Sequence, residues 1–207
     1  TTFSNEKSHF DKLFSHVQET FEHYNTQFYF VRGNHDARGN HAVKFLDYYP
    51  TWTGQPYYAF RQGPVFFIVI DGGEDKPDSD IEYYGTAAFD VYRQEQGKWL
   101  EKVLESEECK TATYRIIVSH IPLTENSWHG GRHAWQHLAQ RCEDKGVNIM
   151  ISGHLHKNRF VKEGVQNRTF PTLIIGSDKL ADVVANKDAL TIKVVNKDGS
   201  VKDTYTF

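Results

Sequence analysis

The pattern of apolar and polar positions divides the chain into alternating helices and strands. Apolar residues at helical spacing predict helices over residues 4–25, 41–48, 92–107 and 133–145. Short apolar runs bounded by turn residues predict strands over residues 27–32, 57–61, 64–71, 114–118, 147–151, 159–162, 172–175, 190–196 and 201–207. The alternation in the middle of the chain is typical of right-handed parallel crossovers, so we expect an α/β fold.

Turns and one long loop complete this pattern. Turn residues around Gly63 predict that the second and third strands form a hairpin, and residues 197–200 predict another between the last two strands. Residues 72–89 are rich in Gly, Asp and Tyr, and an irregular stretch of this length is usually functional or mobile. Within it, Tyr83 and Tyr84 are expected either to contact a substrate or to pack.

Composition and charge narrow the possible classes of protein. The 207 residues, of which 39% are apolar and 25% charged, predict one globular domain over residues 1–207. No apolar run approaches the roughly 20 residues that span a bilayer, so we expect a soluble chain without a membrane partner. A formal charge of −3 and no basic block argue against a nucleic-acid partner. Cys109 and Cys142 are expected to be free buried thiols, with a disulfide between them as the alternative.

Polar residues directly follow three of the predicted strands. The three groups are Gly33-Asn34-His35-Asp36, Ser119-His120 and Gly153-His154-Leu155-His156. Because the carboxyl ends of parallel strands line one crevice, we expect these groups to converge. Imidazole nitrogens bind borderline metals, and asparagine is an uncommon metal ligand, so Asn34 beside His35 and Asp36 strengthens the interpretation as a site. The adjacent His35 and Asp36 offer a proton carrier and a carboxylate to orient it.

With these motifs in this order, the chain resembles the calcineurin-like metallophosphoesterase family, which includes purple acid phosphatases and cyclic-nucleotide phosphodiesterases. The resemblance covers the chain from about residue 27 to 160. It implies an αββα sandwich of mixed sheets, here without its first strands, and hydrolysis of phosphate mono- or diesters in small phosphorylated substrates. It also implies two divalent metal ions (Mn, Zn or Fe) that together activate a hydroxide.

The resemblance further implies a role for each matching residue. Asn34, His120 and His154 would be ligands of one metal ion, and His156 would be a ligand of the other. His35 would protonate the leaving group or stabilise the transition state, and Asp36 would orient His35.

The chain departs from the family before Gly33. The family has an Asp-x-His motif and a Gly-Asp-x-x-Asp motif there, whereas this segment contains one aspartate, Asp11, in a predicted helix. We therefore expect the metal site of His156 to be empty in this chain. An amino-terminally truncated enzyme, inactive as this fragment, is the favoured interpretation, and a noncatalytic module that binds a phosphorylated ligand or a partner is the alternative. Loss of the first strands would expose a sheet edge and favour self-association.

Several other polar residues have two interpretations. Arg38 is either a phosphate contact or an ordinary surface arginine. His133 and His137 either lie on a solvated helix face or form a metal pair. Trp128, His129 and Arg132 either border the substrate entrance or belong to an ordinary loop.

Overall fold

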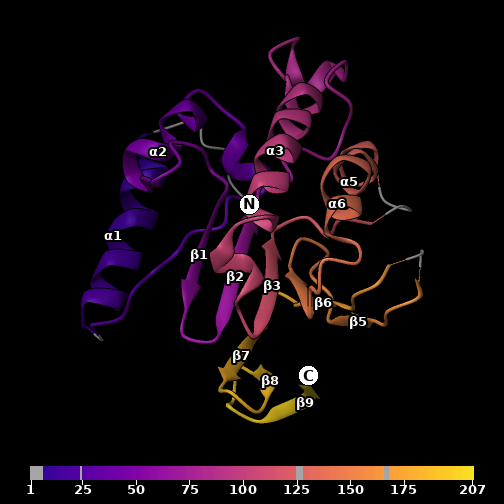
Figure 1. Ribbon diagram of the computed structural model, residues 1–207. Helices are drawn as coiled ribbons and strands as arrows, with labels where there is room; N and C mark the ends of the chain where they lie inside the picture. The colour runs from indigo at the N-terminus through magenta and orange to yellow at the C-terminus, as the bar shows by residue number, and fades with distance from the viewer. Residues whose placement is uncertain (1–6, 24, 125–127, 166–167) are drawn as a thin grey trace.

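A computed structural model of the chain describes residues 7–23, 25–124, 128–165 and 168–207. Its largest element is a six-stranded sheet with the strand order β1-β2-β3-β4-β6-β5 (Figure 1). In chain order these strands are β1 (Tyr58–Gln62), β2 (Val65–Ile70), β3 (Tyr114–Ser119), β4 (Ile149–Ser152), β5 (Arg159–Val161) and β6 (Thr172–Ile174).

The four inner strands of this sheet are parallel and the two outer strands are antiparallel to them. β2, β3 and β4 are in register so that Val69 faces Val118, and Val118 faces Ile151. β1 pairs with β2 as the predicted hairpin, and β5 pairs with β6 at the other edge. Since β2, β3 and β4 run in the same direction, the residues that follow them meet at one edge of the sheet.

Most helices cover one face of this sheet. The helices are α1 (Lys7–His23), α2 (Phe45–Tyr48), α3 (Phe89–Leu104), α4 (Glu107–Lys110), α5 (His129–Ala134) and α6 (Gln140–Cys142). The short 3-10 helices are η1 (Asn34–Ala37), η2 (Ala42–Lys44) and η3 (Ile81–Tyr83), and a π-helical turn, η4 (Trp135–Ala139), joins α5 to α6. Leu100 of α3 and Leu138 of η4 pack against Ile117 and Met150 of the sheet, and all four are fully buried.

A second, three-stranded sheet covers the opposite face. It consists of β7 (Lys179–Ala185), β8 (Leu190–Asn196) and β9 (Val201–Thr206), all antiparallel. Leu190 and Ile192 of its middle strand pack on Ile116 and Ile149 of the large sheet. The predicted α/β class with two sheets is confirmed, although the sequence pattern missed β7, whose apolar positions alternate with Lys and Asp.

The predicted strand over residues 27–32 is wrong, because this segment joins neither sheet. Side chains hold it next to the edge strand β1 instead of a backbone ladder. The Tyr58 hydroxyl donates to the carbonyl of Phe30 at 2.7 Å, and the ring of Tyr29 stacks on Phe60 with centroids 4.0 Å apart. An apolar run predicts burial whether or not the segment is a strand, but a strand also needs a partner strand for its backbone hydrogen bonds.

The ends of two predicted helices are also corrected. The helix predicted over residues 92–107 begins at Phe89, because Asp78 accepts hydrogen bonds from the backbone N–H groups of Phe89 and Asp90 at 2.8 and 3.0 Å. This cap comes from a distant loop residue that helical periodicity does not reveal. The helix predicted over residues 133–145 instead runs from His129 to Cys142.

The two thiols are buried and free, as the first of the two interpretations predicted. Cys109 and Cys142 both belong to the core beneath the helices. Burial is the main cause that raises the pKa of each thiol, so both stay protonated and unreactive at neutral pH.

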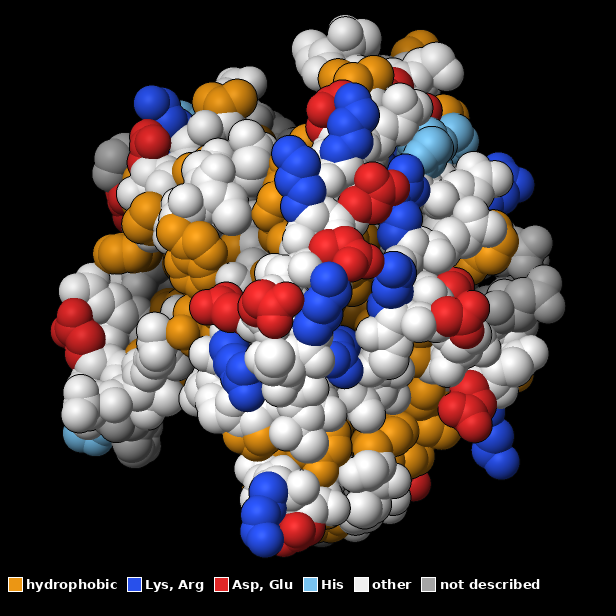
Figure 2. All heavy atoms as spheres, in the orientation of Figure 1, with side chains coloured by type: hydrophobic (Ala, Val, Ile, Leu, Met, Phe, Trp, Pro, Cys, Tyr) orange, Lys and Arg blue, Asp and Glu red, His pale blue; other side chains and the backbone are white. Residues whose placement is uncertain are grey.

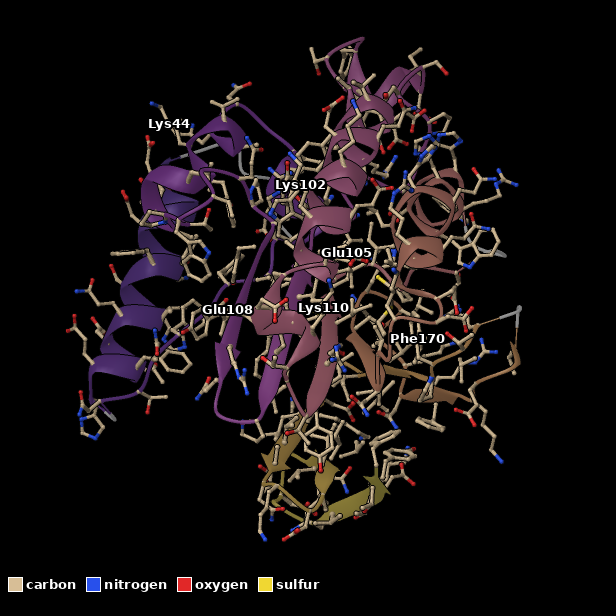
Figure 3. All side chains as sticks on the ribbon, in the orientation of Figure 1. Lys44, Lys102, Glu105, Glu108, Lys110 and Phe170 are labelled. Atoms are coloured by element: carbon tan, nitrogen blue, oxygen red, sulfur yellow. The ribbon has the colours of Figure 1, made fainter. Side chains whose placement is uncertain are left out.

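Charged side chains of both signs are interspersed over α3 and α4, as Figure 2 shows. Glu105 lies beside Lys110 at the end of α3 (Figure 3), with a nitrogen–oxygen distance of 2.8 Å, and Lys145 approaches the same carboxylate at 2.9 Å. These exposed pairs contribute little stability individually, so the stability of the fold depends on its buried apolar clusters. Among the described residues, no helix has both the length and the apolar character needed to cross a bilayer.

We expect Leu100→Ala to lower the free energy of unfolding by about 2–5 kcal/mol, because it leaves a cavity between α3 and the sheet. Val91→Ala on the same helix is the matched control, because Val91 is 60% exposed. Its effect should stay below about 0.5 kcal/mol. Urea unfolding followed by circular dichroism measures both values, and equal effects would contradict the assignment of Leu100 to the core.

Candidate functional site

Three of the predicted polar groups converge where β3 and β4 end. His120 directly follows β3, and His154 lies two residues after β4. Asn34 begins η1, and the preceding glycine brings this turn close to His120: a Cβ atom on Gly33 would lie 3.3 Å from the imidazole. The backbone N–H of Gly153 donates to the carbonyl of His120 at 3.1 Å, which ties the two histidine loops together. The predicted convergence therefore holds for these groups.

Asn34 is buried, and among the described residues only one of the two polar atoms of its side chain is hydrogen-bonded. Its Nδ2 donates to Asp75 Oδ2 at 3.0 Å, whereas its Oδ1 has no hydrogen-bond partner among the described residues. The residue is 2% exposed, and this oxygen is buried. A buried carbonyl oxygen without a partner is costly, and a bound ligand atom would satisfy it.

His120 and His154 lie next to each other and to the same carboxylate. Their ring centroids are 5.2 Å apart, and His154 Nε2 lies 3.1 Å from Asp75 Oδ1. Burial, followed by the neighbouring His154, lowers the pKa of His120 to about 4. His120 is therefore neutral at physiological pH, the form in which imidazole binds a metal.

The backbone of the Gly153-His154-Leu155-His156 turn is strained. His154 and His156 have φ values of 68° and 54°, in the left-handed region that residues with a Cβ atom seldom adopt. Such strain persists only where the surrounding structure imposes it, and it is frequent at functional sites. The side chain of His156 is exposed, whereas that of His154 is 22% exposed and points to Asp75.

His35 and Asp36 lie in the same turn as Asn34 but make different contacts. Asp36 Oδ2 accepts a hydrogen bond from the backbone N–H of Gly33 at 2.9 Å, so it stabilises the turn. Burial, followed by the nearby guanidinium of Arg38, lowers the pKa of His35. Arg38 itself forms a two-pronged ion pair with the buried Glu74, including a 2.7 Å bond from Nη2.

Two acidic residues that the sequence pattern did not reveal complete the site. Glu74 and Asp75 belong to the long loop after β2, and Tyr83, predicted either to pack or to contact a substrate, packs there with its hydroxyl donating to Glu74 at 3.2 Å. The signal was present, because Asp75 follows a buried apolar strand and two glycines, as the recognised motifs follow theirs. Tyr84, by contrast, is 88% exposed.

The histidines of the α5 region form a separate, half-buried row, and histidine side chains gather above α5 in Figure 2. His129 Nε2 lies 2.9 Å from both carboxylate oxygens of Asp90 on α3. The rings of His133 and His137 are 4.2 Å apart, and burial is the main cause that lowers the pKa of each. The row therefore contributes to the contact between α5 and α3 and does not lie on a fully solvated face.

A cavity of about 440 Å³ opens beside Asp75 and His154. Its walls are largely apolar and include Leu155 and Trp128, the latter 66% exposed. A larger cavity of about 770 Å³ lies between α1 and residues 25–30 and is lined by aromatic rings. Only the smaller cavity adjoins the polar cluster, so it is the candidate binding site.

No three His, Cys, Asp or Glu side chains within the described ranges are arranged as a ready metal site. The available donors include an amide, however: Asn34 Oδ1 has no hydrogen-bond partner there, and Asn34 shares the carboxylate of Asp75 with His154. The ring of His120 lies 5.2 Å from that of His154. One amide oxygen and two imidazole side chains suit a borderline divalent ion such as Zn²⁺ or Mn²⁺. The residues at this position thus fit one metal ion.

Comparison with known families gives a match over most of the chain. Residues 5–158 match the family model described as calcineurin-like phosphoesterase. This range contains all the polar groups that converge at the ends of β3 and β4.

Curated relatives are similar at lower identity. The serine/threonine-protein phosphatase CPPED1 of Mus musculus is 24% identical over 135 residues, and that of Pongo abelii is 26% identical over 136 residues. Each match covers 62% of this chain and 41% of the relative. The chain therefore spans less than half of the length of these relatives.

Solved structures share the fold. The purple acid phosphatase PPD1 from yellow lupin (Lupinus luteus) aligns with a TM-score of 0.59 at 17% identity, covering 84% of this chain and 37% of that one. GAP50, the anchor in the inner membrane complex of Plasmodium, aligns with a TM-score of 0.54 at 18% identity, covering 88% and 66%. These similarities confirm the predicted fold class.

The buried His120 should make stability depend on pH. The unfolded chain binds a proton at this residue near pH 6.5, but the folded chain does so only near pH 4. The free energy of unfolding should therefore fall as the pH drops from about 6.5 to 4, by at most about 3 kcal/mol. Urea unfolding of the wild type and His120→Gln should show a smaller decrease in the variant, because His35, His133 and His137, whose pKa values are also lowered, keep their own contribution. His16→Gln, on the exposed face of α1, should behave like the wild type, and the same slope in all three proteins would contradict the assignment.

Proposed function

Because the chain belongs to the calcineurin-like phosphoesterase family, we propose that it takes part in metal-dependent hydrolysis of phosphate esters at the ends of β3 and β4. The observation that carries this proposal is the buried Oδ1 of Asn34, which has no hydrogen-bond partner among the described residues. Its side chain shares Asp75 with His154, and the turn that carries it lies against His120. Relatives that carry the name of a protein phosphatase support the reaction class. They leave the substrate open, since phosphate monoesters and diesters both suit such a site.

Asn34, His120 and His154 would hold one divalent metal ion. When bound, such an ion polarises a phosphoryl oxygen and lowers the pKa of a water molecule. His156 lies on the same turn and would be the ligand of a second ion. In the segment before Gly33 the single aspartate, Asp11, accepts a hydrogen bond from the Tyr48 hydroxyl at 2.8 Å. A single histidine holds a divalent ion poorly, so we propose that this chain binds one ion firmly.

His35 would handle the proton of the reaction. Its lowered pKa makes the protonated ring a stronger acid toward the oxygen of the leaving group. Asp36 would act by holding the turn that carries His35. A phosphate contact by Arg38 would have to share the guanidinium with Glu74, so it stays a prediction.

The apolar cavity beside His154 would receive the alcohol part of the ester. Its walls offer surface to a carbon skeleton, while the polar cluster lies at one side. Binding energy from such a remote group can serve to orient the phosphate.

Binding of a phosphorylated ligand without hydrolysis is the second candidate function. One observation favours it: Asp11, the single aspartate before Gly33, is engaged by Tyr48 and supplies no carboxylate to bridge two ions. The same metal and phosphate contacts would then serve recognition alone.

Titration with Mn²⁺ and orthovanadate tests the site, and 4-nitrophenyl phosphate separates the two functions. By calorimetry we expect one bound Mn²⁺ per chain and vanadate binding that requires Mn²⁺. Asn34→Ala should abolish the binding of both, because it removes the buried ligand oxygen. Absence of Mn²⁺ binding, or binding unaffected by Asn34→Ala, would overturn the metal site.

Hydrolysis of 4-nitrophenyl phosphate that is slow but faster than with Mn²⁺ in buffer alone, and that His35→Asn lowers roughly 10²-fold, would support the hydrolytic function. Vanadate binding without turnover would favour the binding module.

A further inference from the structure

We propose that Asp75 is a positioning residue that determines which atoms of Asn34 and His154 face the shared site. This inference rests on the proposed function for its purpose, but it concerns contacts that exist in the metal-free chain. Asp75 Oδ2 accepts from Asn34 Nδ2 at 3.0 Å, and Asp75 Oδ1 lies 3.1 Å from His154 Nε2. One carboxylate thus connects residues from two of the converging motifs.

The direction of these hydrogen bonds follows from the chemistry of the carboxylate. An ionised carboxylate can only accept, so Asn34 must present its NH₂ group and His154 must carry its proton on Nε2. In the neutral ring with this tautomer, the atoms left without a proton are Asn34 Oδ1 and His154 Nδ1. The first of these is the buried oxygen that has no partner in the described part of the chain. Both atoms can bind a metal ion. A carboxylate that accepts a hydrogen bond from one nitrogen of a histidine orients the other nitrogen toward the metal in this way.

The surroundings of Asp75 favour a carboxylate. Burial acts to raise its pKa, but the hydrogen bond from His154 and the guanidinium of Arg38 outweigh this effect, so the pKa is lowered overall. Its side chain is 14% exposed, which limits competition from water for the two oxygens.

The backbone of Asp75 is itself held in place. Its carbonyl accepts from the N–H of Gly130 at the start of α5, at 2.6 Å. Position 130 admits no side chain, because a Cβ atom there would lie 1.8 Å from the carbonyl oxygen of Glu74. The fully buried Arg93 donates hydrogen bonds to the carbonyls of Glu74 and Gly72, and the bond to Gly72 is 2.8 Å long. The loop is therefore clamped between α3 and α5, with the Asp75 carboxylate directed at the two ligands.

Nuclear magnetic resonance of the metal-free 207-residue chain tests the proposal directly. Long-range ¹H–¹⁵N spectra distinguish the two neutral tautomers of a histidine, and His154→Gln assigns the signal. We expect His154 to carry its proton on Nε2 in the wild type and to lose this preference in Asp75→Asn, because an amide oxygen is a weaker acceptor. A proton on Nδ1 in the wild type, or the same tautomer ratio in both proteins, would overturn the proposal.

Titration with Co²⁺ tests the consequence for metal binding. We expect Asp75→Asn to weaken Co²⁺ binding by about 10- to 100-fold. Asp80→Asn removes the same charge from the same loop, where Asp80 caps η3, and should leave the affinity unchanged. Thermal unfolding of each variant shows whether the fold is intact. Equal affinity in Asp75→Asn and the wild type would overturn the positioning role.

The two proposals can fail separately. If the wild-type chain binds no Co²⁺, the metal site of the proposed function fails, and the tautomer of His154 still decides the role of Asp75. If Co²⁺ binds but the tautomer is independent of Asp75, the metal site stands and the positioning role fails. A general loss of negative charge would weaken metal binding in Asp80→Asn as well, and that result would also count against Asp75.

Discussion

The site depends on one buried cation, the guanidinium of Arg93. This group is fully buried in α3, and it donates to the carbonyls of Gly72 and Glu74 and to the carboxylate of Asp90. An unpaired charge in this position would be prohibitively costly, so the loop after β2 must supply these acceptors. The conformation of the loop, and with it the position of Glu74 and Asp75, follows from that requirement.

Two glycines allow the backbone to approach closely enough for the site to form. At Gly130, helix α5 meets the loop after β2 with no room for a side chain. At Gly33, the turn that carries Asn34 and His35 lies against the imidazole of His120. These contacts bring together four segments that are separate in the sequence, and Gly130 donates a hydrogen bond to the carbonyl of Asp75. Rigid packing of this kind preorganises the ligand atoms before a metal ion or a substrate arrives.

The two acidic residues of the site have different partners. Arg38, at the end of η1, and Glu74 neutralise each other, while the carboxylate of Asp75 contacts Asn34 and His154. A phosphate carries negative charge, so carboxylates near it must be neutralised by a cation or by hydrogen bonds. Asn34 contributes a ligand oxygen without a charge, and the low pKa of His120 keeps that ring neutral. The cluster thus offers metal donors while adding little net charge.

The sequence by itself determined the elements whose signal is local. The apolar runs of β2, β3 and β4 and the polar groups after β3 and β4 were readable, because a strand and the residues that follow it are contiguous. From these, the convergence of Asn34, His120 and His154 and the family could be predicted. Only the tertiary structure decided that residues 27–32 form no strand, that Asp78 sets the start of α3, and that Arg38 pairs with Glu74. It alone placed Asp75, since this residue and Asn34 are 41 positions apart and meet through the packing of α3 and α5 around the loop. Local patterns report burial and chain direction, whereas the partner of a polar side chain depends on which distant segment the packed core brings beside it.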